Sequence, residues 1–212
     1  MKNLKRALSI CMVVAMLGAV LVLASCSLFS SAVESMAEDL VHADSYTYET
    51  DRYILMVDVE NLVGYRKSIP ADKDDEVVEY YYYYDEEKNK YYSATVVDGD
   101  EITKYEIEES DFVQFVGEYA VAGTEIYAYT KLIDKGMFTE TEDGFEWVQV
   151  SEYDEDSKFI ISLYVNDDDQ LCVEEKEVYD GETEKEVEKF YNINDTEIEI
   201  PEDVLKADAK KK

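Results

Sequence analysis

Hydrophobic and polar positions along the chain follow two periods, one of about 3.6 residues near the start and one of two residues over most of the rest. In the first segment, apolar side chains recur at helical spacing and acidic side chains lie on the opposite side. Ser31 and Glu34 have the spacing of a capping box. The pattern therefore predicts an amphipathic helix that ends near His42 to Asp44. Its apolar positions are Val33, Met36, Ala37, Leu40 and Val41.

From Tyr46 onward, short runs alternate between apolar and polar residues, which is typical of β-strands that are buried on one side. Polar loops separate the runs, and Asp98-Gly99 is a strong hairpin signal. Residues 111–122 fit a helix that Asp111 caps and Gly123 stops, but the pattern leaves helix and strand both open. The expected strands are Tyr46 with Tyr48 and the runs 53–59, 77–84, 91–97, 102–107, 126–133, 138–141, 145–150, 159–165, 171–179, 186–193 and 196–200.

One helix followed by many closely spaced strands predicts a single α+β domain, mainly β, over residues 31–205. We expect a curved antiparallel sheet, an open half-barrel, with the N-terminal amphipathic helix packed on one face. Residues 206–212 are expected to form a basic C-terminal tail without core residues. A length of 212 residues suits one domain.

The first 26 residues have a different character. Basic residues precede an uncharged apolar run over residues 7–24, as in an export signal. Leu23-Ala24-Ser25-Cys26 resembles the lipobox of bacterial lipoproteins. That resemblance implies a signal peptide over residues 1–25, a diacylglyceryl group on the Cys26 thiol and a lipidated tether over residues 26–30. The alternative is an uncleaved transmembrane anchor, for which a run of about 18 residues is short.

The use of cysteine agrees with this interpretation. Cys11 lies in the expected signal and Cys26 would carry the lipid, so Cys172 has no partner for a disulfide. Cys172 stands between Leu171 and Val173 in a strand-like run. We expect it to be a small buried hydrophobic residue and not a reactive thiol.

The order of lipobox, amphipathic helix, antiparallel strands and a closing segment Ile198-Glu199-Ile200-Pro201-Glu202-Asp203-Val204 resembles the LolA/LppX-like lipoprotein superfamily, in particular its Gram-positive members. The resemblance implies an open half-barrel whose apolar concave face, covered by a helix, holds acyl chains. It implies no catalytic residues. The expected location is the extracytoplasmic face of the cell membrane of a Gram-positive bacterium, held there by the lipid anchor.

Charge narrows the possible partners. The chain has 51 Asp and Glu residues against 20 Lys and Arg residues, a formal net charge of −31. A surface this negative repels phosphate backbones, so nucleic-acid binding is excluded. It also disfavours close contact of the folded domain with anionic lipid.

Residues that carry out catalysis are scarce. The single histidine is His42, at the end of the expected helix, and there is no Gly-x-Ser-x-Gly elbow, P-loop or Cys-x-x-Cys motif. Acidic turns such as Asp167-Asp168-Asp169 lack the spacing of a calcium-binding loop. We therefore expect no enzymatic activity, no catalytic residue, no cofactor and no dedicated metal site.

The run Tyr80 to Tyr84 contains five consecutive tyrosines. In a strand their side chains alternate between the two faces, so the run forms either a two-sided strand that stiffens the sheet or a binding surface. The candidate ligand-binding residues are Tyr80, Tyr82, Tyr84, Phe159 and Ile161.

These observations support two hypotheses. The first is a non-enzymatic, lipid-anchored lipoprotein that binds a lipid or other amphiphile. It predicts a hydrophobic cavity between residues 31–42 and the sheet, and a solid, fully packed interior there would refute it. The second is an acidic, tyrosine-rich interaction or sensory module that binds a protein partner or a cation and has a tyrosine patch outside the core.

Substitution of Cys26 tests the anchor. We expect Cys26→Ala to leave the protein unprocessed or to release it from membranes, because the acceptor of the two acyl chains is gone. Membrane fractionation combined with the mass of the N-terminus measures both outcomes. A Cys26→Ala protein that is still acylated and still membrane-bound would refute the lipobox assignment.

Overall fold

The structure is a computed structural model that describes residues 32–151, 154 and 156–211; for residues 117–125 and 127 it describes the backbone only. The expected signal peptide, the tether and the capping residue Ser31 lie outside the described residues. The N-terminal helix covers residues 32–41, as predicted.

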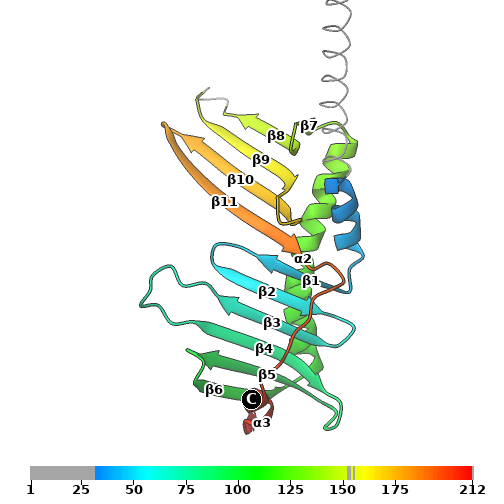
Figure 1. Cartoon of the computed structure of the whole chain (residues 1–212), viewed down its shortest axis with the longest axis vertical. Helices are drawn as coiled ribbons and strands as arrows, with labels where there is room; N and C mark the ends of the chain where they lie inside the picture. The colour runs from blue at the N-terminus through cyan, green and yellow to red at the C-terminus, as the bar shows by residue number, and fades with distance from the viewer. Residues whose placement is uncertain (1–31, 152–153, 155, 212) are drawn as a thin grey trace, which may run out of the picture.

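In the described part of the chain, twelve strands form one open, curved sheet (Figure 1). The strand order is β12-β6-β5-β4-β3-β2-β1-β11-β10-β9-β8-β7, and all neighbours are antiparallel except β12 and β6. The predicted α+β, mainly-β fold with an open curved sheet is confirmed, and the structure has further helices besides the predicted N-terminal one. The strands are β1 Ser45–Glu49, β2 Tyr53–Asp58, β3 Val63–Ser68, β4 Val78–Asp85, β5 Lys90–Val97, β6 Glu101–Ile107, β7 Thr139–Glu140, β8 Gly144–Val150, β9 Lys158–Val165, β10 Leu171–Tyr179, β11 Glu182–Tyr191 and β12 Ala209–Lys211.

One long helix, α2 (Glu109–Asp134), connects the two halves of the sheet. The chain builds β1 to β6 outward, crosses to the far edge through α2, and then builds β7 to β11 inward until β11 pairs with β1. A helix of 26 residues is about 39 Å long, whereas ten strand spacings in a flat sheet amount to about 48 Å. The curvature of the sheet helps the helix and its short connections to join the two edges.

The main core lies between the sheet, α2 and the N-terminal helix. Val33, Ala37 and Leu40 of the N-terminal helix are 0%, 0% and 3% exposed, as the predicted apolar face requires. We call the side of the sheet on which α2 lies the helix face. The buried core residues are Val33, Ala37, Leu40, Tyr46, Tyr48, Leu55, Val57, Phe115, Ile126, Phe138, Phe145, Ile161, Leu163, Leu171, Val173 and Phe190.

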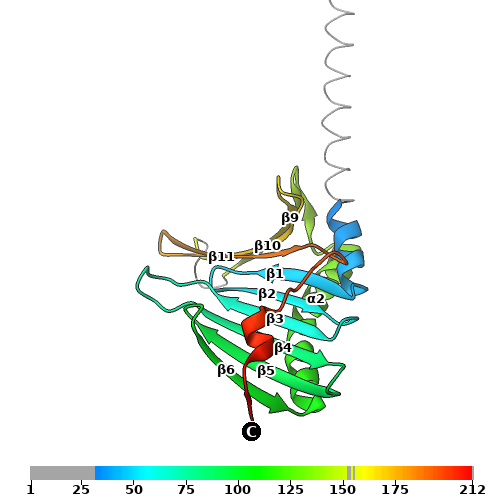
Figure 2. The same cartoon turned by 60° about the horizontal axis from the view of Figure 1, so that its bottom comes forward.

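The C-terminal segment covers the opposite face of the sheet (Figure 2). The short helix α3 (Glu202–Lys206) buries Val204 there. The buried Lys104 ammonium donates hydrogen bonds to the carbonyl oxygens of Val204 and Leu205 at 3.2 and 2.9 Å, and it lies 4.6 Å from the Tyr92 ring centroid. Burial lowers the pKa of Lys104, with the nearby Lys88 adding to the effect. The segment is therefore held by a buried cation that caps α3.

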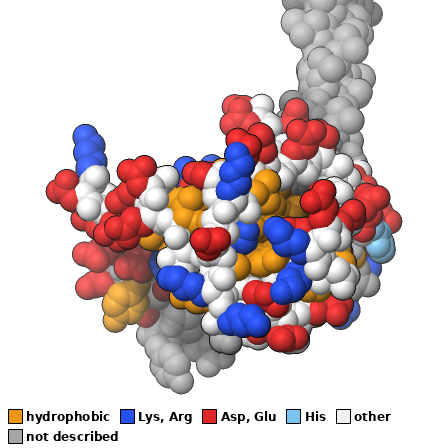
Figure 3. Space-filling model, turned by 90° about the horizontal axis from the view of Figure 1, so that it is seen from below, with side chains coloured by type: hydrophobic (Ala, Val, Ile, Leu, Met, Phe, Trp, Pro, Cys, Tyr) orange, Lys and Arg blue, Asp and Glu red, His pale blue; other side chains and the backbone are white. Residues whose placement is uncertain are grey.

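Beyond α3 the chain adds strand β12 to the edge of the sheet. The predicted tail at 206–212 thus contains a strand, although the side chains of Ala209–Lys211 are exposed. From this end of the molecule, hydrophobic side chains gather in the centre and acidic and basic side chains surround them (Figure 3). The two edge strands, β7 and β12, have only two and three residues, which limits edge-to-edge pairing with other chains.

Three segments differ from the sequence prediction. Residues 126–133 were predicted as a strand, but they belong to α2, which continues through Gly123. Residues 111–122, for which helix and strand were both open, are helix. Strand β3 was missed, because Arg66 and Lys67 hide its alternation. Residues 196–200 form no strand.

The residues around 196–200 are held in another way. The hydroxyl groups of Thr47 and the buried Thr196 are 3.2 Å apart, and Thr196 Oγ1 donates to the Asn192 carbonyl at 2.8 Å. These side-chain hydrogen bonds hold the segment against the face of the sheet. A strand would instead have paired with the edge of the sheet through backbone hydrogen bonds.

At Gly64, a side chain of α2 lies directly against strand β3. A Cβ atom there would lie 2.2 Å from Phe115 Cε1. The Phe115 ring cannot move away freely, since it stacks on Tyr82 with centroids 3.8 Å apart. The absence of a side chain at Gly64 therefore allows the helix to pack.

We expect Gly64→Ala to lower the free energy of unfolding by about 1–3 kcal/mol through overpacking. Both hydrophobic clusters consist of residues from Val33 to Val204, so residues 27–212 keep the whole described core and suit urea unfolding. Phe115→Leu should reduce the cost of Gly64→Ala in a double-mutant cycle. A Gly64→Ala protein as stable as the parent would contradict this close approach.

Candidate functional site

The structure places all five predicted ligand-binding residues on the helix face. Strand register gives Tyr80, Tyr82 and Tyr84 of β4 this orientation, and it does the same for Phe159 and Ile161 of β9. Ile161 is 6% exposed and the other four are half-buried. Five strands separate β4 from β9, so the residues share a face but do not form one compact site.

Helix α2 covers part of this face. Near β4, Phe115 stacks on Tyr82, and Phe112 lies 5.4 Å from the ring centroid of Tyr91. Near the C-terminal end of α2, Tyr129 Oη donates to Glu175 Oε1 at 3.3 Å. Tyr82 is therefore part of the helix–sheet packing, while Tyr80, two residues along the strand, lies beside the helix.

A row of half-buried side chains follows one side of α2 on the helix face. Tyr80 is paired with Arg66 across β3 and β4, and the Arg66 guanidinium carbon lies 4.6 Å from the ring centroid of Tyr53. At the other end of the sheet, Trp147 and Phe159 meet edge to face with centroids 6.2 Å apart. We call these five residues the uncovered strip.

Sequence reasoning found Tyr80 and Phe159 of the uncovered strip and missed the other three residues. Arg66 lies in the strand that the pattern did not predict. Tyr53 and Trp147 lie in predicted strands. Alternation within a strand separates its two sets of side chains, but it does not show which set lies on the same face of the sheet as a given set of another strand. Only the pairing registers show that the five side chains share one face of the sheet.

Between the two aromatic ends, β10 and β11 carry glutamates on the helix face, beside the buried core residues of the same strands. Glu175 is paired with Glu186, and Glu177 with Glu184, across β10 and β11. Each pair places two acidic side chains directly opposite each other, so this part of the helix face carries a local excess of negative charge. Nearby, Tyr48 Oη donates to Glu188 Oε1 at 2.6 Å, and burial together with this carboxylate raises the pKa of Tyr48.

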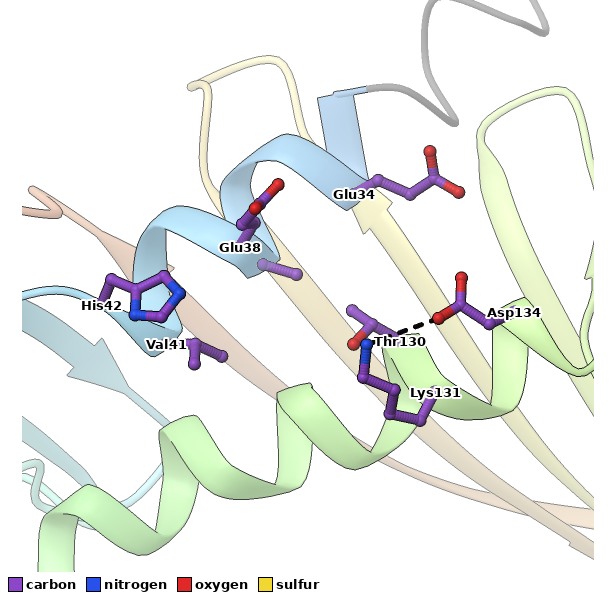
Figure 4. A pocket seen from close by; sticks show the side chains of 8 residues that line it. Glu34, Glu38, Val41, His42, Thr130, Lys131 and Asp134 are labelled. Carbon is purple, nitrogen blue, oxygen red and sulfur yellow. Dashed lines mark hydrogen bonds and ion pairs between the residues drawn. The ribbon is translucent and has the colours of Figure 1, made fainter.

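Among the residues that the structure describes, no hydrophobic cavity lies between the N-terminal helix and the sheet. Val33, Ala37 and Leu40 fill the space between this helix and the sheet. A depression of about 480 Å³ does lie between this helix and α2 (Figure 4), but Glu34, Glu38 and Asp134 line it together with Lys131. The amphiphile site expected under this helix is therefore wrong, and any amphiphile site has to lie elsewhere, as in the uncovered strip.

Two other polar features of the described residues are the single histidine and a hollow lined by carboxylates. His42 is exposed at the end of the N-terminal helix and borders the same depression. A second hollow, of about 490 Å³, has several carboxylates, including Asp44, Glu60 and Asp195. Within the described ranges, no three His, Cys, Asp or Glu side chains are grouped so that they could hold a metal ion.

Tyr81 and Tyr83, the odd-numbered tyrosines of the run, lie on the opposite face of the sheet. Tyr81 and Tyr83 are 5% and 2% exposed beneath the C-terminal segment. Burial, with Glu79 and Asp203 nearby, raises the pKa of Tyr81 to about 12. The buried Tyr83 hydroxyl makes no hydrogen bond with any described residue. The run is a two-sided strand.

Cys172 is a free cysteine and is 1% exposed, as predicted. Burial raises the pKa of its thiol. A protonated, inaccessible thiol is a poor nucleophile, so this residue belongs to the packing of the sheet.

Comparison of the chain with protein-family models, curated proteins and solved structures gives no match. The resemblance to the LolA/LppX-like superfamily therefore stays a prediction. Among the described residues, no helix has the length and apolar character needed to cross a membrane.

Buried tyrosines make the fold sensitive to alkali. Tyr46, Tyr81, Tyr164 and Tyr191 have pKa values raised by burial to about 12, against about 10 in an unfolded chain. Their neutral forms stabilise the fold fully below pH 10, and this stabilisation is lost as the pH rises from 10 to 12. We expect tyrosinate absorbance to rise steeply in that window, together with loss of β-sheet circular dichroism.

Two variants check this origin. Tyr83→Phe removes a buried hydroxyl without a partner, so it should leave stability unchanged or raise it and move the transition to higher pH. Tyr179→Phe, at a position that is 71% exposed, should leave the transition in place. Gradual tyrosinate formation with an intact sheet would contradict the assignment.

Proposed function

We propose that this chain is a non-enzymatic lipoprotein, anchored through Cys26 on the extracytoplasmic face of the cell membrane, that binds a lipid or other amphiphile along the uncovered strip. One observation carries the binding part of the proposal. Aromatic side chains from both halves of the sheet stay half-buried on the helix face, next to a core of buried side chains from the described part of α2 and from the sheet.

The chemistry of the strip suits an amphiphile. Tyrosine and tryptophan combine an apolar ring with a polar group, so they contact an alkyl chain and a hydrated headgroup equally well. Binding sites for small molecules are usually apolar and aromatic with a few polar groups. Tyr53, Tyr80, Trp147 and Phe159 supply the rings, and Arg66 supplies a charge.

The proposed anchor agrees with this use. From Cys26 to the start of the described helix at residue 32, an extended chain reaches about 20 Å. A domain on so short a tether stays beside the bilayer, where amphiphiles are concentrated. The net charge of −31 meanwhile opposes adsorption of the domain onto anionic lipid.

The alternative is an acidic interaction or sensory module. It is favoured by the paired glutamates of β10 and β11 and by Tyr179, which is 71% exposed at the end of β10. The tyrosine run gives it less support, since Tyr81 and Tyr83 are buried and the other three are at most half-exposed. A basic protein or a cation would be the partner in this case.

Native mass spectrometry separates the two functions. Residues 27–212 are incubated with a total bacterial lipid extract and purified again, and we expect a stoichiometric lipid adduct. Tyr80→Ser should reduce the bound fraction about 5- to 30-fold, because one ring contributes roughly 1–2 kcal/mol of apolar contact.

Tyr179→Ser is the matched control, because it makes the same change at the end of β10, and it should retain the adduct. An unliganded mass for the parent protein would overturn the proposal and favour the interaction module. An adduct that Tyr80→Ser and Tyr179→Ser affect equally would place the ligand elsewhere on the molecule.

A further inference from the structure

Arg66 is the single basic residue that strands β1–β11 present on the helix face. It is paired with Leu55 on one side and with Tyr80 on the other, both of which share that face. Every other basic residue of these strands has the opposite orientation. They are Lys67, Lys90, Lys104, Lys158, Lys176, Lys185 and Lys189.

Several cations on the opposite face have an acidic partner. Lys189 is 2.8 Å from a Glu49 carboxylate oxygen, and Lys185 is 2.6 Å from Glu174. Lys67, next to Arg66 in the chain, lies 3.5 Å from Glu79. In a chain with 51 acidic residues, such pairing is easily achieved.

Arg66 is different. It is half-buried, its guanidinium lies over the Tyr53 ring, and no carboxylate of the described residues is within ion-pair distance. A cation that is partly removed from water loses hydration, and an anion would compensate for that loss. The planar guanidinium presents paired N–H donors that match the oxygens of a carboxylate or a phosphate.

We propose that Arg66 binds the anionic headgroup, a carboxylate or a phosphate, of the amphiphile in the uncovered strip. This inference rests on the function proposed above and adds the class of ligand. Tyr53 and Tyr80 flank the guanidinium. The glutamate pairs Glu175–Glu186 and Glu177–Glu184 repel an anion from the middle of the same face. The headgroup therefore has one favourable position among these strands.

The test uses three probes with the same alkyl chain: oleate, oleyl phosphate and the neutral oleyl alcohol. Each is added to residues 27–212 at mildly alkaline pH, and the bound fraction is measured by native mass spectrometry over a concentration series. We expect oleate and oleyl phosphate to bind about tenfold or more tightly than oleyl alcohol, as a charge-assisted contact implies.

Three variants assign the preference to Arg66. Arg66→Gln should bring the anionic probes to the affinity of the alcohol, and Arg66→Lys should retain part of the preference, because it keeps the charge but loses the paired donors. Arg52→Gln is the matched control, because Arg52 is 76% exposed beside Asp51, and it should bind like the parent. Circular dichroism checks that all variants are folded.

The outcomes separate this inference from the proposed function. Equal binding of the anionic probes and the alcohol to the parent, or an anionic preference that survives Arg66→Gln, overturns the role of Arg66 and leaves amphiphile binding in place. If the parent binds none of the three probes and takes up no lipid from the bacterial extract, amphiphile binding fails and the headgroup site fails with it.

Discussion

The packing of α2 across both halves of the sheet is the contact on which the rest of the structure depends. Strands β1 and β11 pair over Thr47–Glu49 only, so the ladder between the two halves is short. The helix adds a second connection, with Phe112 and Phe115 over one half and Tyr129 over the other. Since each half alone would expose its apolar face, the helix and the sheet stabilise each other.

The course of α2 also decides which side chains are available to a ligand. Where the helix lies on the strands, rings such as Phe115 and Tyr82 stack on each other and are removed from water. Beside it, Tyr80 and Arg66 keep part of their surface in water. Binding surface and core thus come from the same strands, and two residues along β4 separate a ring that packs in the core, Tyr82, from a candidate contact, Tyr80.

Much of the sheet was predictable, because alternation reports burial on one side of a strand. It succeeded for the tyrosine run, whose two faces enter two separate clusters. It failed at Arg66 and Lys67, because two charged residues in succession interrupt the alternation of β3, although β3 lies between β2 and β4 in the sheet. It also failed at residues 126–133, where the apolar spacing fits a helix as well as a strand. For the candidate site, the face of Tyr80 and Phe159 was anticipated. That Arg66 shares this face with both of them follows from the registers between strands far apart in the sequence, which a local pattern does not contain.

Cys172 provides the second half of the sheet with a reporter of its own. It is the single cysteine after Cys26, and its neighbours across the ladder are Tyr164 and Lys189. Because the thiol is fully enclosed, a reagent reaches it only when β9, β10 and β11 separate. The rate of thiol labelling therefore measures the opening of this region separately from global unfolding, without a label that alters the surface. Occupation of the uncovered strip, which includes Phe159 of β9, would slow that opening and make ligand binding visible as thiol protection.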